Sequence, residues 1–376
     1  MHFVIDAHLA VKKIDGVARY LMGLLSELPQ IDRSIQYSIL TLPLEHSSLP
    51  EDIFKQPNVN RVRFNLIGPS PIQHLKMRSL LKDLKADLYH HPQYDLPFGV
   101  QVPSVVTIHD LKYLFHAEFL KKGSLLKSLY IKKSLQHTIK AADQIIVASQ
   151  NTLSDLIKLF SFEQDKVTII YHGVNPASKS SSNHNHDFFD IPNEFILFVG
   201  TRRPHKNIEG LIKALAILRN NHKLNVDLVI SGKAYSEYSK PEKVVKELGI
   251  ETHTHFLDFV SETELTSLYQ AAKLVALPSF YEGFGFPLLE AMSYGKPVIG
   301  SNLSSMPEVI GNAGLLVDPY NPNDIAKKIH EIITDSNLYQ KLSEAGLERC
   351  KQFSWSSVAK ATFNVYIKAL KIKKIS

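Results

Sequence analysis

The segment from Lys273 to Asn302, KLVALPSFYEGFGFPLLEAMSYGKPVIGSN, constrains the fold of this chain most strongly. Its apolar run Leu274 to Leu277 predicts a strand, and a turn that contains two glycines follows. Residues 287 to 294 then predict a helix, and residues 297 to 300 predict a second short strand. Strand, helix and strand in this order form one βαβ unit, which is the building block of a parallel sheet.

The turn of this unit predicts a phosphate site with a carboxylate on either side. Gly283 and Gly285 lack a Cβ atom, so their backbone N–H groups can approach a ligand closely. Pro287 fits the first helical position, and the helix N-terminus directs its unsatisfied donors at the turn. Glu282 precedes the turn and Glu290 follows it, with seven residues between them. Because a phosphate is not stable between two bare carboxylates, we interpret both as ligands of sugar hydroxyls, which outlines a nucleotide-sugar site.

This turn allows two other interpretations. The glycine pair could open a dinucleotide-binding fingerprint, but the third position is Leu288, and the following strand ends in Ser301 and Asn302 instead of an acid. The two glutamates could also be solvated surface acids, which is the usual state of an isolated glutamate.

Length and composition limit the classes of protein to which this chain can belong. A chain of 376 residues favours two domains, and its 44% hydrophobic and 21% charged residues are ordinary for a globular protein. The single cysteine, Cys350, excludes an intrachain disulfide and suits a reducing, cytoplasmic compartment. The opening MHFVIDAHLA predicts a first strand and not a signal peptide, and no run of 18 apolar residues predicts a membrane span.

The net charge of +6 does not indicate a nucleic-acid-binding protein, because no aromatic interleaving or base-reading motif accompanies the basic residues. Part of the charge is local, since Lys121 to Lys140 contains six lysines and no acid. This segment predicts a basic amphipathic helix that either lies on an anionic membrane or packs its apolar stripe on its own domain. The stripe would contain Leu125, Leu126, Leu129, Tyr130, Leu135 and Ile139.

Short apolar runs alternate with helical patterns along the rest of the chain, which predicts parallel sheets with helices on both faces. Ligands of such sheets bind beyond the carboxyl ends of the strands. The serine-, asparagine- and proline-rich residues 173 to 193 predict a linker, and His184 and His186 within it lack the companions of a metal site. Predicted strands in the first half include residues 3 to 6, 61 to 67 and 105 to 108, and the last predicted helix spans residues 356 to 372.

Three loops lie where chemistry is expected. Gly16, after the first strand, could bring a backbone N–H to a pyrophosphate, and its alternative is a helix-entry glycine. His109, after the strand ending at Ile108, could hydrogen-bond a sugar, and its alternative is a histidine bonded to backbone. The basic turn from Thr201 to Lys206 could neutralise a diphosphate, and its alternative is a solvated surface turn.

The combination of these motifs resembles the retaining glycosyltransferases of family 4. The segment EGFGFPLLE followed by AMSYGKPVI is similar to the E-x7-E segment of that family. The resemblance continues over most of residues 195 to 355, in order and with family-like spacing. It includes VGTRRPHKN, FLDFVSETELTSLYQAA, SSMPEVIGNAGLLVDPYNPNDIA and FSW, and in the first half the family's G-x-x-R-Y and T-x-H-D patterns at Gly16 and His109.

The resemblance implies the GT-B fold, an α/β architecture of two Rossmann-like domains facing across a cleft. The implied acceptor domain covers residues 1–172 and the donor domain residues 194–355, joined by the 173–193 linker. Residues 356–376 would form a helix that crosses back to the first domain.

The resemblance also implies roles for individual residues. As catalytic residues, Glu282 would hold the hydroxyls of the transferred sugar, His109 would orient that sugar, and Lys206 would neutralise the departing diphosphate. The sequence departs from the family at Thr201 and His205, where arginine is common. The implied donor-binding residues are Gly16, Arg202 or Arg203, Lys206, Phe284, Gly285, Phe286 and Glu290.

The implied reaction is retaining transfer of a hexose, mannose or glucose by preference, from a nucleotide diphosphate sugar to a glycan or lipid-linked hydroxyl. It would serve the synthesis of cell-surface polysaccharide or lipopolysaccharide at the cytoplasmic face of a membrane. No cofactor or metal is expected, because no two aspartates stand two residues apart as in the D-x-D motif of the other large glycosyltransferase fold. A nucleotide-sugar epimerase and a non-catalytic sugar-binding subunit stay open as alternatives.

Overall fold

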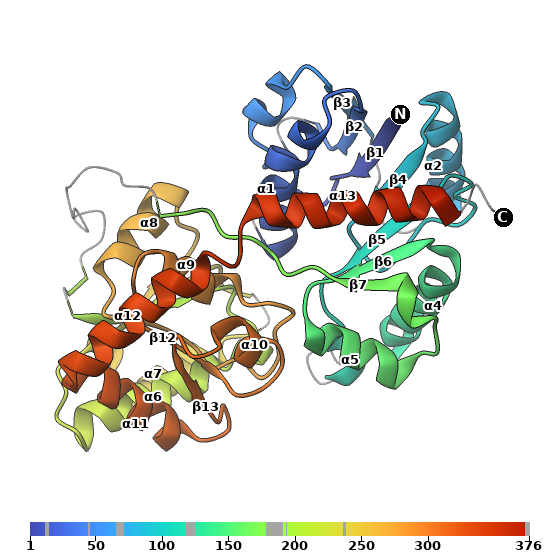
Figure 1. The fold of residues 1–376 in the computed structure, drawn as a ribbon. Helices are drawn as coiled ribbons and strands as arrows, with labels where there is room; N and C mark the ends of the chain where they lie inside the picture. Colours follow the sequence, from blue (N-terminus) through green and yellow to red (C-terminus); the bar gives the residue numbers. More distant parts are fainter. Residues whose placement is uncertain are drawn as a thin grey trace. The chain divides into compact units, whose positions relative to one another are not determined.

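The computed structural model describes residues 1–11, 15–43, 46–64, 71–116, 125–177, 191–192, 194–235 and 238–372. The chain divides into two compact units, each built from strands and helices (Figure 1). Unit 1 contains Met1–Gly173 and Phe353–Ser376, and unit 2 contains Val174–Gln352. Most of the predicted linker lies outside the described residues, because residues 178–190 and 193 are not among them.

Unit 1 is built on a parallel sheet of seven strands in the order β3-β2-β1-β4-β5-β6-β7. The strand order reverses between β1 and β4, and a crevice opens at such a switch point beyond the carboxyl ends of the strands. The strands are β1 (His2–Asp6), β2 (Gln36–Thr41), β3 (Val59–Arg63), β4 (Leu88–His91), β5 (Ser104–Ile108), β6 (Gln144–Val147) and β7 (Val167–Ile169).

Helices cover the sheet of unit 1. Residues of α2, α4 and α5 join one core cluster with Val4, Tyr89 and Val106 of the strands, and α1 packs along α13 (Figure 1). The bounds are α1 (Gly16–Ile31), α2 (Pro71–Asp83), α3 (Lys112–Phe115), α4 (Leu125–Ala141), α5 (Gln150–Leu159) and α13 (Trp355–Ile372), with 3-10 turns η2 (Glu51–Lys55) and η4 (Gln164–Lys166).

The last helix, α13, is fixed to unit 1 by one aromatic side chain and one buried polar contact. A Cβ atom on Gly23 of α1 would lie 2.0 Å from Trp355 Cε2, so the glycine makes room for the indole. Farther along the helix, the Tyr366 hydroxyl and His90 Nδ1 lie 2.6 Å apart, and both side chains are fully buried.

Unit 2 contains a second parallel sheet, of six strands in the order β10-β9-β8-β11-β12-β13. Its order reverses between β8 and β11, which places a second switch point there. The strands are β8 (Phe195–Val199), β9 (Asp227–Ser231), β10 (Thr254–Leu257), β11 (Leu274–Leu277), β12 (Val298–Ser301) and β13 (Leu315–Val317).

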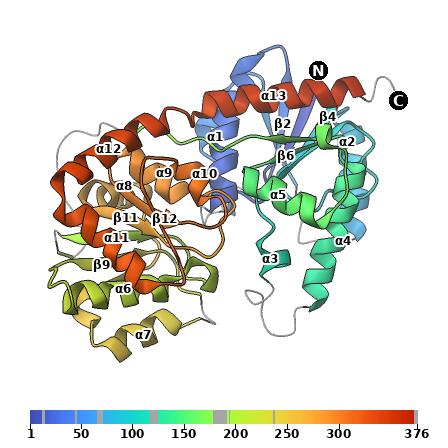
Figure 2. The same cartoon turned by 60° about the horizontal axis from the view of Figure 1, so that its bottom comes forward.

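The helices of unit 2 pack in two groups, with α6, α7 and α11 in one and α9, α10 and α12 in the other, on opposite sides of the strands (Figure 2). The predicted apolar face of α6 is confirmed, because Ile208, Leu211, Ile212, Leu215 and Leu218 are all buried. The bounds are α6 (Ile208–Asn220), α7 (Lys240–Leu248), α8 (Glu262–Ala271), α9 (Phe286–Ser293), α10 (Met306–Ile310), α11 (Pro322–Thr334) and α12 (Ser336–Cys350), with 3-10 turns η6 (Pro204–Lys206) and η7 (Glu251–His253).

These two sheets confirm the predicted α/β fold class, and several local predictions need correction. The strand predicted for residues 61–67 is β3, which begins at Val59 and ends at Arg63, while residues 65–67 lie outside the described part. The predicted single stripe of the lysine-rich helix divides. Leu135 and Ile139 of α4 are buried, whereas Leu129 and Tyr130 are 54% and 40% exposed. The core-facing side chain one turn before Leu135 is Ile131 instead.

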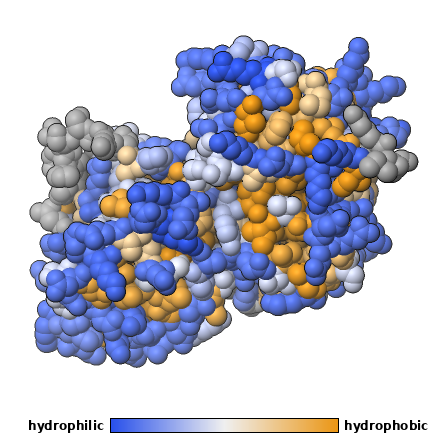
Figure 3. Space-filling model, viewed as in Figure 1, coloured by the Kyte–Doolittle hydropathy of each residue, from blue (hydrophilic) through white to orange (hydrophobic). Residues whose placement is uncertain are grey.

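Hydrophilic side chains cover much of the face drawn in Figure 3, and apolar residues are interspersed among them. Across the described ranges, none of the helices is both long enough and apolar enough to cross a membrane.

Candidate active site

The loops that follow β8 and β11 form the candidate active site of unit 2. Lys206 lies at the end of η6 after β8, and Glu282 lies in the loop after β11. Because β8 and β11 are neighbours at the switch point, the two loops meet. Lys206 Nζ donates to Glu282 Oε1 at 2.5 Å, and the two side chains are only 14% and 11% exposed. Two residues 76 positions apart in the sequence therefore form one nearly buried ion pair.

Asn207 locks the loop that carries Lys206 in place. It begins α6 as its N-cap with a left-handed φ of 54°, and its Oδ1 accepts from the Gly210 N–H at 3.2 Å. Its Nδ2 donates to the carbonyls of Pro278 at 3.0 Å and Pro319 at 2.6 Å. The sequence analysis missed this residue, although a buried asparagine directly before an apolar helix is a recognisable cap signal.

Several hydroxyl groups fix Glu282. Ser279 Oγ donates to the same Oε1 at 2.8 Å. The Glu282 N–H donates to Ser304 Oγ at 3.0 Å, and the Glu282 carbonyl accepts from the hydroxyls of both Ser304 and Ser305. Among the described residues, no hydrogen bond reaches Glu282 Oε2. One carboxylate oxygen is thus held by the protein while the other can accept from a ligand hydroxyl.

The glycine turn leads into α9, with Gly285 as the helix N-cap, and Glu290 lies within the helix. Gly285 has a φ of +101°, and a Cβ atom there would lie 2.5 Å from Met306 Cε, so both conformation and space require glycine. Phe284 and Phe286 on either side are buried in an edge-to-face pair with ring centres 5.5 Å apart. Glu290 Oε2 accepts from the Tyr269 hydroxyl at 2.6 Å. Tyr269 therefore orients this carboxylate, a role the sequence analysis did not identify.

The two candidate arginines have different surroundings. Arg202 is 5% exposed and donates to Glu242 at 2.8 Å, to Asp258 at 2.7 Å and to the Gly232 carbonyl at 3.0 Å. Its charge is compensated inside unit 2 by two carboxylates, whereas Lys206 is paired with Glu282. The Arg203 guanidinium lies over the Tyr235 ring, 5.0 Å from its centre.

The two predicted residues of the first half belong to unit 1. Gly16 is the exposed first residue of α1, next to the helix cap Asp15, whose carboxylate accepts from two backbone N–H groups at 3.0 Å. His109 follows β5, with Nε2 3.2 Å from the Pro92 carbonyl and Nδ1 3.3 Å from His172 Nε2. Burial lowers the pKa of His109 to about 4, so its ring is neutral near pH 7. Both ring nitrogens already have protein partners, and a sugar hydroxyl would have to replace one of them.

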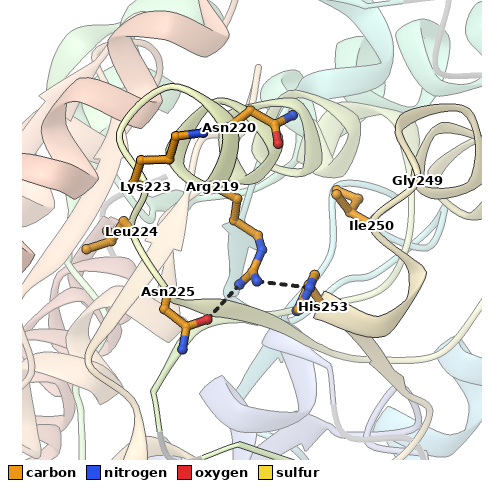
Figure 4. A pocket seen from close by; sticks show the side chains of 8 residues that line it. All are labelled: Arg219, Asn220, Lys223, Leu224, Asn225, Gly249, Ile250 and His253. Atoms are coloured by element: carbon orange, nitrogen blue, oxygen red, sulfur yellow. Dashed lines mark hydrogen bonds between the residues drawn. The ribbon is translucent and has the colours of Figure 1, made fainter.

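A cavity of about 440 Å³ lies at the opposite edge of the unit 2 sheet, where β9 and β10 begin (Figure 4). Arg219 occupies its centre and donates to Asn225 Oδ1 at 3.3 Å, while its other terminal nitrogen lies 2.9 Å from His253 Nε2 (Figure 4). None of the predicted site residues lines this cavity. Ligands of parallel sheets bind at the carboxyl edge, so this cavity is not the candidate active site.

Two family models cover the chain. The model described as Glycosyltransferase Family 4 matches residues 14–178, and the one described as Glycosyl transferases group 1 matches residues 182–349. The O-antigen chain mannosyltransferase B of Escherichia coli is 32% identical over 291 residues, which are 76% of this chain and 75% of that protein. A D-inositol 3-phosphate glycosyltransferase of Corynebacterium glutamicum is 29% identical over 62% of this chain and 59% of that protein. The chain spans about a third of another group of relatives, the serotype-specific mannosyltransferases WbdA of Escherichia coli.

Solved structures show the same fold at low sequence identity. Sucrose-phosphate synthase from Thermosynechococcus elongatus superposes with a TM-score of 0.80 at 19% identity, over 100% of both chains. WaaG, a glycosyltransferase involved in lipopolysaccharide biosynthesis, has a TM-score of 0.75 at 17% identity over 97% of this chain and 99% of that chain. The family models, the Escherichia coli relative and the shared architecture agree, and the chain belongs to family 4 of the glycosyltransferases, enzymes of the GT-B fold.

Proposed function

We propose that this enzyme transfers a hexose, mannose or glucose, from a nucleotide diphosphate sugar to a hydroxyl of a glycan or lipid-linked acceptor. The transfer retains the anomeric configuration, requires no metal and serves the synthesis of cell-surface polysaccharide or lipopolysaccharide. The observation that carries this proposal is the Lys206–Glu282 pair at the switch point of unit 2. The relative named O-antigen chain mannosyltransferase B supports the sugar and the setting, and the Anabaena HepE structures, solved with UDP and with UDP-glucose, support the donor class.

The pair is suited to a donor whose leaving group carries two phosphates. Negative charge grows on the diphosphate as the glycosidic bond breaks, and a fixed ammonium group stabilises that charge more than it stabilises the intact donor. Lys206 supplies this group, with Arg203 of the same basic turn proposed as the second cation, and Arg202 binds Glu242 and Asp258. These cations take the place that a divalent metal fills in metal-dependent enzymes, which is our reason for proposing metal independence.

The carboxylates are suited to the sugar parts of the same donor. Glu282 Oε2 would accept from hydroxyls of the transferred hexose, while Lys206 and Ser279 hold Oε1. Glu290, oriented by Tyr269, would accept from the ribose hydroxyls. The backbone of residues 284–286 and of Gly16 would contact the phosphates, and His109 would orient the hexose near its reacting carbon. No side chain is assigned as a nucleophile.

A thermal-shift panel tests the donor site. The panel contains UDP, GDP and ADP and their glucose, mannose and N-acetylglucosamine forms. A ligand present at about a hundred times its dissociation constant adds about 2.7 kcal/mol to the free energy of unfolding, which is readily visible. We expect a shift with one nucleotide that is lost in Glu290→Ala and kept in Glu344→Ala, an exposed acid of α12 that serves as the matched control. No shift with any compound would favour the non-catalytic subunit, and conversion of the free nucleotide sugar without transfer would favour the epimerase.

We also propose a peripheral contact with an anionic membrane at the cytoplasmic face, through α4 and its neighbourhood. Leu129 and Tyr130 are exposed on this helix, and Phe98, 54% exposed, lies beside it with its ring centre 3.9 Å from that of His137. Lys132 and Lys133 are exposed on the same helix, so apolar and cationic side chains occur together. The first part of the predicted segment, Lys121 to Ser124, lies outside the described residues.

Co-sedimentation with vesicles tests this contact. Vesicles with a quarter anionic lipid should bind the protein, and neutral vesicles should bind it weakly. The double variant Lys132→Gln, Lys133→Gln should lose about 2 kcal/mol of binding, since each lysine near an anionic surface contributes about 1 kcal/mol. Lys360→Gln, on the exposed side of α13, is the matched control. Binding that does not depend on anionic lipid or on the two α4 lysines would disprove the contact.

A further inference from the structure

A second polar cluster occupies the switch point of unit 1, and the sequence analysis did not identify it. Asp6 ends β1 and His91 ends β4, the two strands between which the order of this sheet reverses. One Asp6 oxygen is bound by His8 Nδ1. The other lies 3.3 Å from His91 Nδ1 and accepts from the Tyr89 hydroxyl at 2.8 Å. His91 Nε2 in turn lies 3.2 Å from Asp95 Oδ1.

The charges inside this cluster are largely compensated. Burial alone would lower the pKa of His91, but hydrogen bonds to Asp6 and Asp95 and their charges outweigh burial and raise that pKa to about 9. Burial would raise the pKa of Asp6, but the contacts with His8 and His91 hold it well below its usual range. One imidazolium therefore lies between two carboxylates, which compensate its positive charge.

His8 is the member of the cluster that can reach a ligand. Its side chain is 16% exposed, and its ring stacks on that of His91 with centres 6.4 Å apart. The contact with Asp6 places a proton on Nδ1, and a neutral ring with its proton there has a lone pair on Nε2. Within the described ranges, no protein group hydrogen-bonds this Nε2. The Asp95 carboxylate, 26% exposed, is the second accessible member.

We propose that His8 Nε2 and the Asp95 carboxylate form the site that receives the acceptor, and that they select an uncharged sugar by accepting hydrogen bonds from its hydroxyls. This inference rests on the proposed function and names its acceptor class. Both accessible groups accept hydrogen bonds, so the matching ligand must donate them, as sugar hydroxyls do. Asp95 is the charged member of the cluster that reaches the surface, and its carboxylate repels a phosphate.

This selection separates the two acceptor classes that the names of the relatives suggest. One relative is named for an O-antigen chain, a glycan that presents sugar hydroxyls, and another for D-inositol 3-phosphate, which also carries a phosphate. The cluster of unit 1 favours the first class. The sugar end of the acceptor would lie beyond the carboxyl ends of β1 and β4, where the crevice of a parallel sheet receives ligands.

Transfer assays with two kinds of acceptor test this inference. The donor is the one identified by the thermal-shift panel, and the acceptors are octyl glycosides of mannose, glucose and N-acetylglucosamine and, separately, D-inositol 3-phosphate. The wild type should use at least one octyl glycoside and should not use the inositol phosphate. In His8→Ala the KM for that glycoside should rise about tenfold, the effect of one lost hydrogen bond of about 1.4 kcal/mol. The nucleotide-induced thermal shift should stay unchanged, because His8 is not among the proposed donor-binding residues.

Two further variants keep the test decisive. His8→Asn places an amide N–H near the position of Nδ1, so it can keep the contact with Asp6 while it removes Nε2. It should fold like the wild type and still show the raised KM, even where His8→Ala is unstable. His46→Ala, an exposed histidine elsewhere in unit 1, should change neither value.

The outcomes separate this inference from the proposed function. An unchanged KM in both His8 variants, efficient use of the inositol phosphate, or transfer to none of the neutral glycosides by an enzyme that binds its donor would overturn it. A wild type that shows no thermal shift with any nucleotide contradicts the proposed function itself.

Discussion

Replacing Lys206 by alanine should separate the catalytic role of this residue from its structural role. The variant removes an ammonium group that lies 2.5 Å from Glu282 Oε1, in a pair whose members are 14% and 11% exposed. Glu282 then keeps the Ser279 hydroxyl on this oxygen but loses its counter-charge. Breaking a nearly buried pair in this way costs about 3 kcal/mol of stability, at the lower end for buried pairs because some water reaches both groups. A domain with an unfolding free energy of about 5–15 kcal/mol still folds after this loss.

The effect on the rate should be larger than the effect on folding. Removing one fixed group that stabilises transition-state charge lowers kcat by about 100- to 1,000-fold. Urea unfolding at 25 °C measures the stability, and initial rates with the donor from the thermal-shift panel measure the activity. Lys213→Ala, an exposed lysine of α6, is the matched control and should change neither.

The double variant Lys206→Ala, Glu282→Gln sharpens the test. It removes the unpaired carboxylate as well, so it should regain most of the lost stability. It should not regain activity, because the cation near the diphosphate is still absent and Glu282, the proposed partner of the sugar hydroxyls, is now replaced as well. Retention of more than half of the wild-type rate in Lys206→Ala would refute the reasoning, and so would a double variant that recovers rate together with stability.

Three other predictions concern the surroundings of the two sites. Arg202→Met should lower the unfolding free energy measured in urea by about 2 kcal/mol, because it leaves two partly solvated carboxylates without their counter-charge. The KM for the donor should not change. A raised KM without loss of stability would show that Arg202 binds the phosphates. Asn207→Ala should lower the unfolding free energy by about 1 kcal/mol through loss of the helix cap, and by more because two carbonyl groups lose their donor. It should also lower kcat, because the loop that carries Lys206 is no longer anchored. Full activity would contradict this coupling. The raised pKa of His91 stabilises the fold fully below pH 6.5 and less as pH rises through about 9. The melting temperature should therefore fall between pH 7.5 and 10, and it should fall by less in His91→Gln. An equal fall in the wild type and in the variant would show that His91 does not carry the charge.

The local elements around the donor site could be predicted because their signals are local. The apolar run at residues 274–277 is β11 without any shift, and the glycine turn, Pro287 and the following apolar residues define α9 within one residue. Lys206 and Glu282 were each singled out by local motifs, and a known resemblance connected them. Their direct contact depends on β8 and β11 being neighbours, which is a property of the sheet and not of either segment.

Residues whose partners are distant in sequence could not be assigned in this way. Arg202 and Arg203 are adjacent and chemically equal, and neither segment reveals that Glu242 and Asp258, 40 and 56 residues away, bind Arg202. The motif predicts that His109 binds a sugar, but its Nδ1 already contacts His172, which lies 63 residues away in the sequence. In both places a tertiary contact already engages a polar group that the local motif offers to a ligand.

The lysine-rich helix shows the limit of periodicity. A stripe that included Leu129, Tyr130, Leu135 and Ile139 was predicted from spacing alone. Successive residues of a helix are turned by about 100°, so Ile131, Leu135 and Ile139 share one face while Leu129 and Tyr130 lie away from it. The core of unit 1 takes the first set, and the second set is exposed. Exposed apolar residues beside lysines are the feature that packing against the domain does not explain.

The two switch points also explain why one site was recognised from sequence and the other was not. The described strands of each sheet reverse their order once, between β1 and β4 in unit 1 and between β8 and β11 in unit 2, and a crevice for ligands is expected at such a switch point. In unit 2 the crevice contains an ammonium group and a carboxylate, which suits a ligand with phosphates and hydroxyls. In unit 1 it contains hydrogen-bond acceptors around a charge that is already neutralised, which suits hydroxyls alone. Asp6 and His8 stand in the first ten residues as an ordinary pair of polar side chains, and only the adjacency of β1 and β4 brings His91 to them.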